Sequence, residues 1–421
     1  MGRKKKVLLI LTLIGQLVIS SRAQLSPGQY LEEAPLGSWN IFGLESASAL
    51  GAGFCQVVFA HSGTSVLTNP ALLNSLPANN LTLNLGFSQT QLFRYWLVNT
   101  GVLTTSGNLS YRAARINFFN LSHRVHDWSL ALSYACPENY GRPAIDYQDF
   151  STGILSHRLK ISQSGELKNY TLTLSRQLTR GLSLGLSLIW IDGQINRNLE
   201  ETWPPDQVEM LDYRYQKISG FYPLIGLSGK ISSRLRLGLS FIPSYHKKVQ
   251  GKSSLIFRSF SDNTDIEIQD EAVDRIKMPQ ILAAGVSYAF KENLQIMLET
   301  VHFSWRNYSY VYFGEPRSEK FRSVIRVSLG LDYQTTFRFL HHTWNSPYYF
   351  GLMIDPQPMT DIKSTYYYVT FGSGVDWSSF SLRFATAIGI EKGSGRNLKN
   401  QKISLTLNFH PDLKTILRSR K

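Results

Sequence analysis

The sequence lacks a long apolar run after its first segment and has very few cysteines. Beyond Ala23 no stretch of about 18 uncharged apolar residues occurs, so a membrane-spanning helix is not expected. The only cysteines, Cys55 and Cys136, are too few for a disulfide scaffold and have no metal-binding spacing. Two alternatives stay open for them: one bridge formed in an oxidising compartment, or two buried free thiols.

Motifs of catalytic chemistry are also missing. The sequence has no Gly-x-Ser-x-Gly elbow, no phosphate-binding glycine loop and no His-Glu-x-x-His motif. His123 and His126 fall in a predicted tight turn, and His341 and His342 are neighbours in a predicted loop, all without further metal ligands. We therefore predict no catalytic residue, no metal site and no cofactor.

The N-terminus has the pattern of a secretory signal peptide. Basic residues at 3–6 precede an apolar run from Val7 to Ile19, and small and polar residues follow up to Ala23. The run is too short for a spanning helix, and a retained anchor is the less favoured alternative. We predict a signal peptide at 1–23. The rest of the chain has 39 basic and 30 acidic residues, a net charge of +9.

That positive charge does not indicate a nucleic-acid partner, because the basic residues are scattered and the chain is exported. Attraction to anionic lipid headgroups or lipopolysaccharide fits it better.

From about Leu81 to Phe409 apolar residues alternate with small or polar ones. The clearest segment has Leu182, Leu184, Leu186, Leu188 and Trp190 on one face, with serine and glycine on the other. Successive side chains of a strand point to opposite faces, so each such segment has one apolar and one polar side. Aromatic residues make up 12% of the chain, enough for the interfacial girdles of a membrane barrel.

We count fourteen segments of this kind, and the connections between them alternate in length. Long connections are predicted at 90–111, 137–166, 193–219, 247–278 and 305–320, and short ones lie between them. A further connection at 335–346 is long on the side where short turns are expected. Short turns on one side and long loops on the other are typical of outer-membrane barrels. We therefore predict an all-β fold, a transmembrane antiparallel β-barrel of about 14 strands at 81–409, and treat a soluble all-β protein as the alternative.

The segment 24–80 lacks this alternation and is rich in small residues. It is long enough to fill part of a fourteen-stranded lumen, and we predict that it is an N-terminal luminal hatch. The glycines Gly51 and Gly53 favour close packing, and Asn69-Pro70 favours a defined turn. An ordinary loop turn is the alternative for the Asn-Pro motif. The residues 410–421 form a predicted periplasmic tail.

Three stretches resemble the FadL-type outer-membrane transporters. The glycine-bearing stretch before Asn69-Pro70-Ala71 resembles their hatch, although Phe54 and its neighbours depart from the usual pattern. Met278-Pro279-Gln280 is similar to the start of one of their strand pairs, and Tyr349–Leu352 with Asp355–Pro358 to a late strand and loop. The resemblance implies a hatch site at Gly51, Gly53, Phe54, Asn69, Pro70 and Ala71, and it leaves the ligand-binding residues unknown.

The resemblance also implies a function, which is passive uptake of hydrophobic small molecules such as long-chain fatty acids, gated by the hatch. The alternative is a secretion-associated barrel like PorV, or a structural one, that binds protein partners; an outer-membrane enzyme is a third and weaker hypothesis. We expect a monomer in the outer membrane. Barrel-assembly machinery would recognise the final alternating segment Ile403, Leu405, Leu407 and Phe409.

Overall fold

The computed structural model describes residues 42–410, except 45, 60–61, 100–103, 152, 310, 313–314, 317–319, 340–341, 361–362, 378, 394–396 and 398. The predicted signal peptide at 1–23, the beginning of the predicted hatch at 24–41 and the tail from 411 lie outside the described residues. No helix in the described part is long and apolar enough to cross a membrane.

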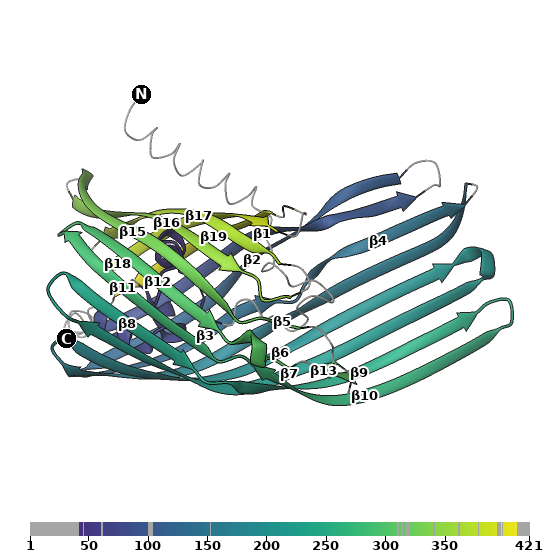
Figure 1. Cartoon of the computed structure of the whole chain (residues 1–421), viewed down its shortest axis with the longest axis horizontal. Helices are drawn as coiled ribbons and strands as arrows, with labels where there is room; N and C mark the ends of the chain where they lie inside the picture. The colour runs from purple at the N-terminus through teal and green to yellow at the C-terminus, as the bar shows by residue number, and fades with distance from the viewer. Residues whose placement is uncertain are drawn as a thin grey trace, which may run out of the picture.

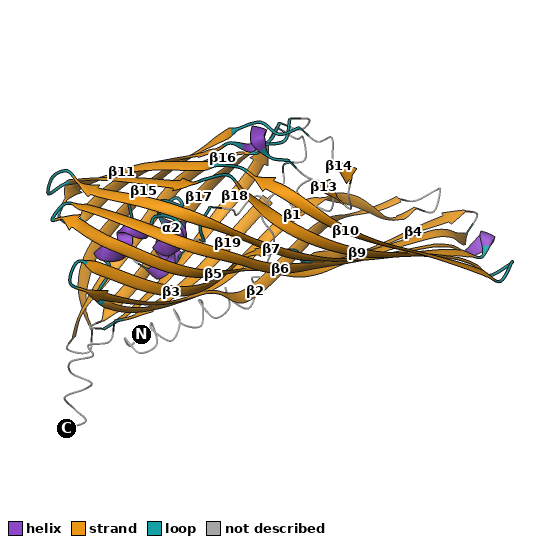
Figure 2. Cartoon of the chain, turned by 90° about the horizontal axis from the view of Figure 1, so that it is seen from below, coloured by secondary structure: helices purple, strands orange, loops and turns teal. Residues whose placement is uncertain are grey.

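Fourteen antiparallel strand positions close into a barrel, shown in Figures 1 and 2. Three positions are each broken into two strands: β3 with β4, β8 with β9, and β10 with β11. The barrel strands are β1 Asn79–Asn99, β2 Thr104–Val125, β3 Trp128–Asn139, β4 Arg142–Ser151, β5 Ile154–Thr179, β6 Leu182–Trp203, β7 Val208–Lys230, β8 Leu235–Ile242, β9 Tyr245–Ser259, β10 Thr264–Met278, β11 Ile281–Lys291, β12 Leu294–Phe303, β15 Val324–Phe339, β16 His342–Pro356, β17 Thr365–Trp377, β18 Phe380–Lys392 and β19 Lys399–Phe409.

A separate two-stranded sheet and five short helices complete the described elements. The small sheet pairs β13 Val311–Tyr312 with β14 Glu315–Pro316. The helices are α2 Ala47–Gly51, η1 Gly63–Leu67, η2 Pro70–Ser75, η3 Pro204–Asp206 and η4 Trp305–Asn307.

The barrel closes where its first and last strands meet. β1 pairs with β19 from Leu81 opposite Phe409 to Thr90 opposite Asn400. This pairing confirms the predicted fold class and shows that the final alternating segment is the closing strand. The first and last strands thus leave no open edge along this pairing, as the closure of a membrane-spanning sheet requires.

Burial follows the alternation that the sequence shows. On β6, Leu184, Leu186 and Trp190 are exposed on the outside, whereas Ser187 and Ile189 are buried inside. Similar rows of exposed leucine and aromatic side chains recur on the other strands. The outside of the barrel therefore offers an apolar surface to lipid, and its inside is free to hold small, polar and selected apolar groups.

The predicted long loops at 90–111, 137–166, 193–219 and 247–278 are wrong, because these segments are mostly strands. The β6–β7 ladder runs without interruption to Trp203 opposite Val208, and the β9–β10 ladder to Ser259 opposite Thr264. Outside a bilayer both faces of a strand pair can be polar. The alternation of apolar and polar residues is therefore lost there, although the backbone pairing continues. The segment 335–346 is likewise the end of the β15–β16 hairpin.

The extended hairpins form a flat projection beyond the barrel rim (Figure 1). We call this projection the blade and define it as β4 with the segments 154–163, 197–214 and 253–270. Its strands lie in the order β4, β5, β6, β7, β9 and β10.

Two proline breaks lie at the same level of the wall. Pro243 separates β8 from β9, and Pro279 separates β10 from β11. Proline cannot donate to the ladder, so each strand is interrupted at that point. The hydroxyl of Ser244 donates to the carbonyl of Met278 at 2.7 Å and joins the two breaks.

Candidate functional site

The described part of the predicted hatch lies inside the barrel. The helices α2, η1 and η2 are drawn within the ring of strands in Figure 2. Every residue of α2 and η1, and all of η2 except its last, is buried. α2 contacts β17, β18 and β19, and η2 contacts β5, β6 and β7 on another side of the lumen.

The six predicted hatch residues fall into two groups on different parts of the wall. Gly51, Gly53 and Phe54 lie at the end of α2, where a Cβ on Gly53 would collide with backbone carbonyls of the wall. Gly53 and Phe54 both have positive φ, so the chain turns sharply here. The ring of Phe54 packs edge-on against Tyr368, with the ring centroids 5.4 Å apart.

Asn69, Pro70 and Ala71 form the second group at the start of η2. The Asn69 side chain accepts from the N–H of Ala71 at 3.2 Å and caps the helix, while Pro70 occupies its first turn. The Asn69 amide also donates to the carbonyls of Val57 at 2.7 Å and Leu227 at 3.0 Å. One side chain thus joins the turn, another part of the hatch and the barrel wall.

Glycines on the inner face of the wall let the hatch backbone approach closely. A Cβ on Gly226 would collide with Asn69 and Pro70, and one on Gly185 with Pro70 and Ala71. Gly185 and Gly226 are paired across β6 and β7. Similar contacts occur at Gly238, Gly330 and Gly351. In the sequence, such a glycine appears only as a small residue on the polar face of a strand, and this pattern does not predict the contact with the hatch.

Wall side chains that sequence analysis missed complete the hatch site. The carboxylate of Glu299 accepts from the N–H groups of Gln56 and Val57 at 2.8 and 2.7 Å. The hydroxyl of Thr370 accepts from the N–H of Gly53 and donates to the carbonyl of Gly51. Ser187 donates to the carbonyl of Val66 at 2.6 Å. These bonds satisfy backbone groups of the buried hatch.

The cysteines are not paired. Cys55 lies in the hatch and Cys136 on β3, and both are buried free thiols. Burial raises the pKa of the Cys55 thiol well above its ordinary value, so its reactive thiolate is scarce while the hatch stays packed.

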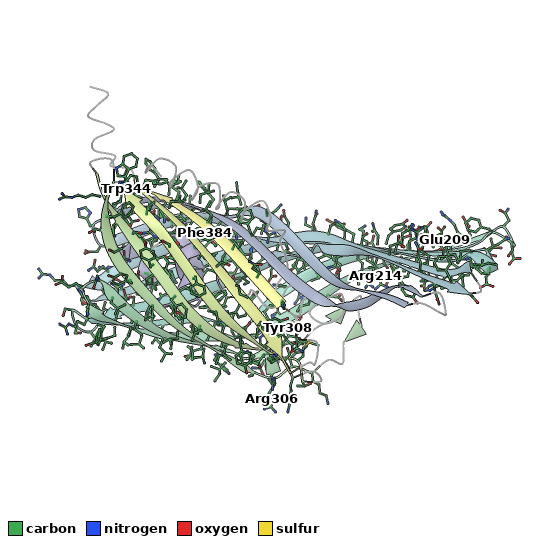
Figure 3. All side chains as sticks on the ribbon, turned by 90° about the horizontal axis from the view of Figure 1, so that it is seen from above. Glu209, Arg214, Arg306, Tyr308, Trp344 and Phe384 are labelled. Atoms are coloured by element: carbon green, nitrogen blue, oxygen red, sulfur yellow. The ribbon has the colours of Figure 1, made fainter. Side chains whose placement is uncertain are left out.

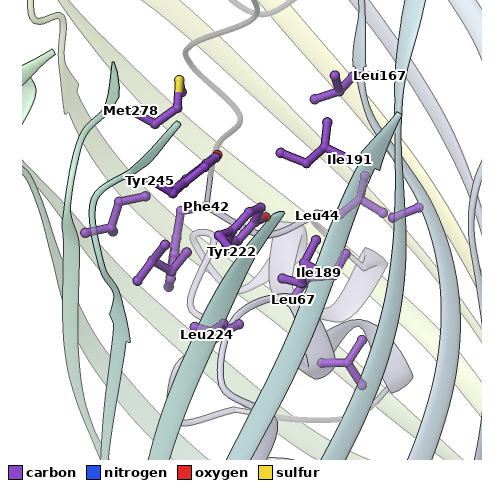
Figure 4. Close-up of a cluster of buried hydrophobic side chains, with 14 of the residues drawn as sticks. Phe42, Leu44, Leu67, Leu167, Ile189, Ile191, Tyr222, Leu224, Tyr245 and Met278 are labelled. Atoms are coloured by element: carbon purple, nitrogen blue, oxygen red, sulfur yellow. The ribbon is translucent and has the colours of Figure 1, made fainter. Parts of the chain in front are cut away.

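A continuous apolar cluster lines the lumen around the hatch (Figure 4). Phe42, Leu44 and Leu67 contribute from the hatch side. Strand residues surround them, among them Ile189, Ile191, Leu224 and the stacked pair Tyr222 and Tyr245, whose ring centroids are 4.4 Å apart. The same cluster continues to Phe118, Ala135, Tyr140 and Leu167 on β2, the β3–β4 position and β5.

A buried cation on β15 borders this cluster. The guanidinium of Arg326 on β15 lies 5.5 Å from the ring centroid of Phe303 and 6.0 Å from that of Phe42. Two of its nitrogen atoms are buried without a hydrogen-bond partner among the described residues. Aromatic faces offset part of the cost of burying such a charge.

The wall is interrupted between β2 and β3, beside the apolar cluster. Their ladder ends at Phe118 opposite Ala135. Beyond it β2 pairs with β1, and the β3–β4 position pairs with β5 after a register shift that contains Pro137. The guanidinium of Arg115 spans the interruption and donates to the carbonyl of Cys136 at 3.0 Å and to that of Glu138 at 3.4 Å. A flexible side chain therefore replaces the missing backbone ladder.

Solved structures of 14–15% sequence identity have the same fold. A FadL homologue of Pseudomonas aeruginosa superposes with a TM-score of 0.65 at 14% identity, covering 88% of this chain and 99% of the other. The toluene transporters TbuX of Ralstonia pickettii and TodX of Pseudomonas putida each give 0.59, at 14% and 15% identity, covering 88% of this chain and 98% of theirs. These matches confirm the expected FadL-type barrel. No curated protein matches the sequence.

The family comparison covers almost the whole chain. The sequence model of the BamG family matches residues 5–402. Because the match includes the described hatch segment and every barrel strand as far as the start of β19, the chain belongs to the BamG family.

Proposed function

We propose that this chain is an outer-membrane barrel through which hydrophobic small molecules pass, with the hatch as its gate. The observation that supports this most directly is the apolar cluster that runs from the hatch to the β2–β3 interruption. The free energy of an apolar solute falls when it leaves water for such a surface, by about 25 cal/mol per Å² of apolar area buried. A lumen lined only by charged and polar side chains would not offer this gain.

The proposed route leaves the barrel sideways. The described part of the hatch lies inside the barrel, and it is bound to the wall through Glu299, Thr370 and Asn69. The interruption beside Ala135 gives an exit into the bilayer that needs no broken backbone ladder. A solute would displace the Arg115 side chain rather than a strand. Long-chain fatty acids and monoaromatic hydrocarbons are the two substrate classes that we propose.

The similar solved barrels support the solute class without fixing it. Two of them are described as toluene transporters, and none of the three is described as an enzyme. Monomeric action, contact with outer-membrane lipopolysaccharide and recognition of Ile403, Leu405, Leu407 and Phe409 by assembly machinery stay proposals.

Uptake of radiolabelled oleate and toluene by cells that lack other transporters for them tests this proposal. The variant Ile189→Asn puts an amide into the apolar cluster, and we expect a several-fold loss of uptake. Ile154→Asn is the matched control, because Ile154 is 67% exposed at a hairpin tip. Retained resistance of the barrel to cold SDS would show that both variants fold. The proposal would be rejected if cells took up both substrates equally well with and without the wild-type chain.

A second candidate function is a role in barrel assembly through protein partners, which the BamG family match favours. The dense hydrogen bonding of the hatch also suits a barrel that stays closed. Cells depleted of the chain would then contain fewer folded barrel proteins even when no hydrophobic nutrient is supplied. Normal amounts of folded barrels together with lost uptake would favour the first function.

A further inference from the structure

The two faces of the blade differ most toward its β9–β10 edge. On its outer face, opposite charges pair across the strands: Arg158 with Asp146 at 2.6 Å, Lys160 with Glu200 at 2.7 Å, and Arg258 with Glu209 at 3.2 Å. Figure 3 shows Glu209 of this face near the far end of the blade, whereas Arg214, closer to the barrel, lies on the inner face, where it pairs with Asp212 at 2.8 Å. The charged outer face is stable in water without cover.

The inner face continues the luminal face of the barrel and carries apolar residues beside the ion pairs Arg214–Asp212 and His157–Glu201. Ile191 and Ile195 of β6 point into the lumen, and Leu199 follows on the same side because side chains alternate. In register with Leu199 lie Ile161 on β5, Leu255 on β9 and Ile268 on β10, and Asp212 of β7 lies between Leu199 and Leu255. Phe257 and Ile266 form an adjacent pair on this face. These six residues define the inner patch.

The inner patch is uncovered at its edge. Ile266 and Ile268 are 51% and 58% exposed, so no described part of the chain covers them. A sheet normally buries its apolar face against another element, and a contiguous apolar patch on a protein surface marks an interaction site.

The blade also ends in an open, acidic strand edge. β10 pairs with β9 along its length, and the described residues give its other edge a single bridge, between Lys277 and Ser309. From Thr264 to Asp274 this edge strand has five acidic residues and no basic one. Unpaired N–H and C=O groups along a strand are a template for one more strand.

We propose that the blade binds a second protein by strand addition to β10, and that the added segment alternates basic and apolar residues. Its apolar side chains would extend the inner patch, and its basic side chains would face the acidic residues of β10. A strand of like charge would be repelled, which makes the acidic edge selective. The proposal deepens the second candidate function and rests on it only for the idea that the partner is a protein.

The test uses the full chain in nanodiscs of neutral phosphatidylcholine and fluorescein-labelled peptides. The probes are a ten-residue peptide of alternating valine and lysine and its valine–glutamate counterpart. We expect fluorescence anisotropy to show saturable binding of the basic peptide only. Ile268→Asp should weaken this binding about tenfold or more, because it places a charge on the inner patch. Ile154→Asp, an equally apolar exposed position outside the patch, should leave it unchanged.

A variant with Glu267, Asp270 and Glu271 changed to the corresponding amides should also weaken binding and reduce its dependence on salt. Equal binding of both peptides, or an equal loss in Ile154→Asp, would overturn the proposal. So would a wild-type dimer that Ile268→Asp converts to a monomer, because a second copy would then be the occupant. Oleate uptake should be unchanged in Ile268→Asp, which separates failure of this surface from failure of the transport proposal.

Discussion

Asn69 joins three parts of the molecule, and its loss should loosen the hatch. Asn69→Ala removes the cap of η2 and leaves the carbonyls of Val57 and Leu227 without this donor. We expect the hatch to lose about 1–3 kcal/mol of local stability. Cys55 should then react with N-ethylmaleimide roughly tenfold faster or more, since each 1.4 kcal/mol is a factor of ten in the open population.

The same measurement has an internal control. Peptide mass spectrometry reports Cys55 and Cys136 separately, and Cys136 on β3 should keep its slow rate in Asn69→Ala. Asn198→Ala on the exposed blade should change neither rate. An unchanged Cys55 rate in Asn69→Ala would show that Asn69 does not hold the hatch.

Gly226 offers a sharper test of hatch packing, because a glycine three residues away serves as its control. A Cβ at 226 would collide with Asn69 and Pro70, whereas one at Gly229 would meet Ile231 and Leu182 at 3.7 and 3.9 Å. We expect Gly226→Ala to displace the hatch, speed alkylation of Cys55 and raise single-channel conductance in planar bilayers. Gly229→Ala should behave as the wild type. Equal conductance of the two variants would mean that the hatch is not seated on this glycine.

At the level of elements, the Arg115 side chain covers the interruption between β2 and β3. The Arg115 guanidinium donates to the carbonyl of Cys136 and lies 3.0 Å from its sulfur atom. Arg115→Ala should therefore expose Cys136 and speed its alkylation, while Cys55 stays slow. The opposite result, faster alkylation of Cys55 alone, would place the opening at the hatch instead. Leu121→Ala, on the same strand where the β2–β3 ladder is intact and with a side chain that is 53% exposed, is the control.

The sequence predicted the strands inside the barrel better than their extensions. Alternation was clear on β6 up to Trp190, where the outside faces lipid and the inside faces the hatch. It faded beyond residue 193, where charged residues such as Glu200 and Glu201 lie on successive positions of a water-exposed ribbon. A pattern that depends on one apolar face cannot mark the end of a strand whose pairing continues outside the bilayer.

The candidate site was predictable only in part, for a similar reason. Asn69-Pro70 could be recognised because a turn motif is local in sequence. Glu299 binds the backbone of Gln56 and Val57, which lie more than 240 residues away in the sequence. No local sequence pattern predicts such a partner. The ladder interruption was also hidden, because Pro137 alone does not show which neighbouring strand has moved away.

At the scale of the whole molecule, the blade and the barrel should be separable. Ser254 and Gln269 face each other on β9 and β10, so residues 255–268 can be replaced by Asn-Gly without disturbing the ladder below. The excision removes four of the six residues of the inner patch and the ion pair between Arg258 and Glu209. A partly exposed pair of this kind contributes only about 0–1 kcal/mol, so the barrel should keep its resistance to cold SDS.

This excision separates the two functions in one molecule. If hydrophobic solutes pass through the lumen and proteins bind the blade, the shortened chain should take up oleate as the wild type does and fail to bind the valine–lysine peptide. An equal-length excision at the β15–β16 end, outside the blade, should retain both activities if the barrel closes. Lost uptake in a correctly folded chain without the β9–β10 tip would instead show that solutes are first captured on the blade, so that transport and docking share one apolar surface.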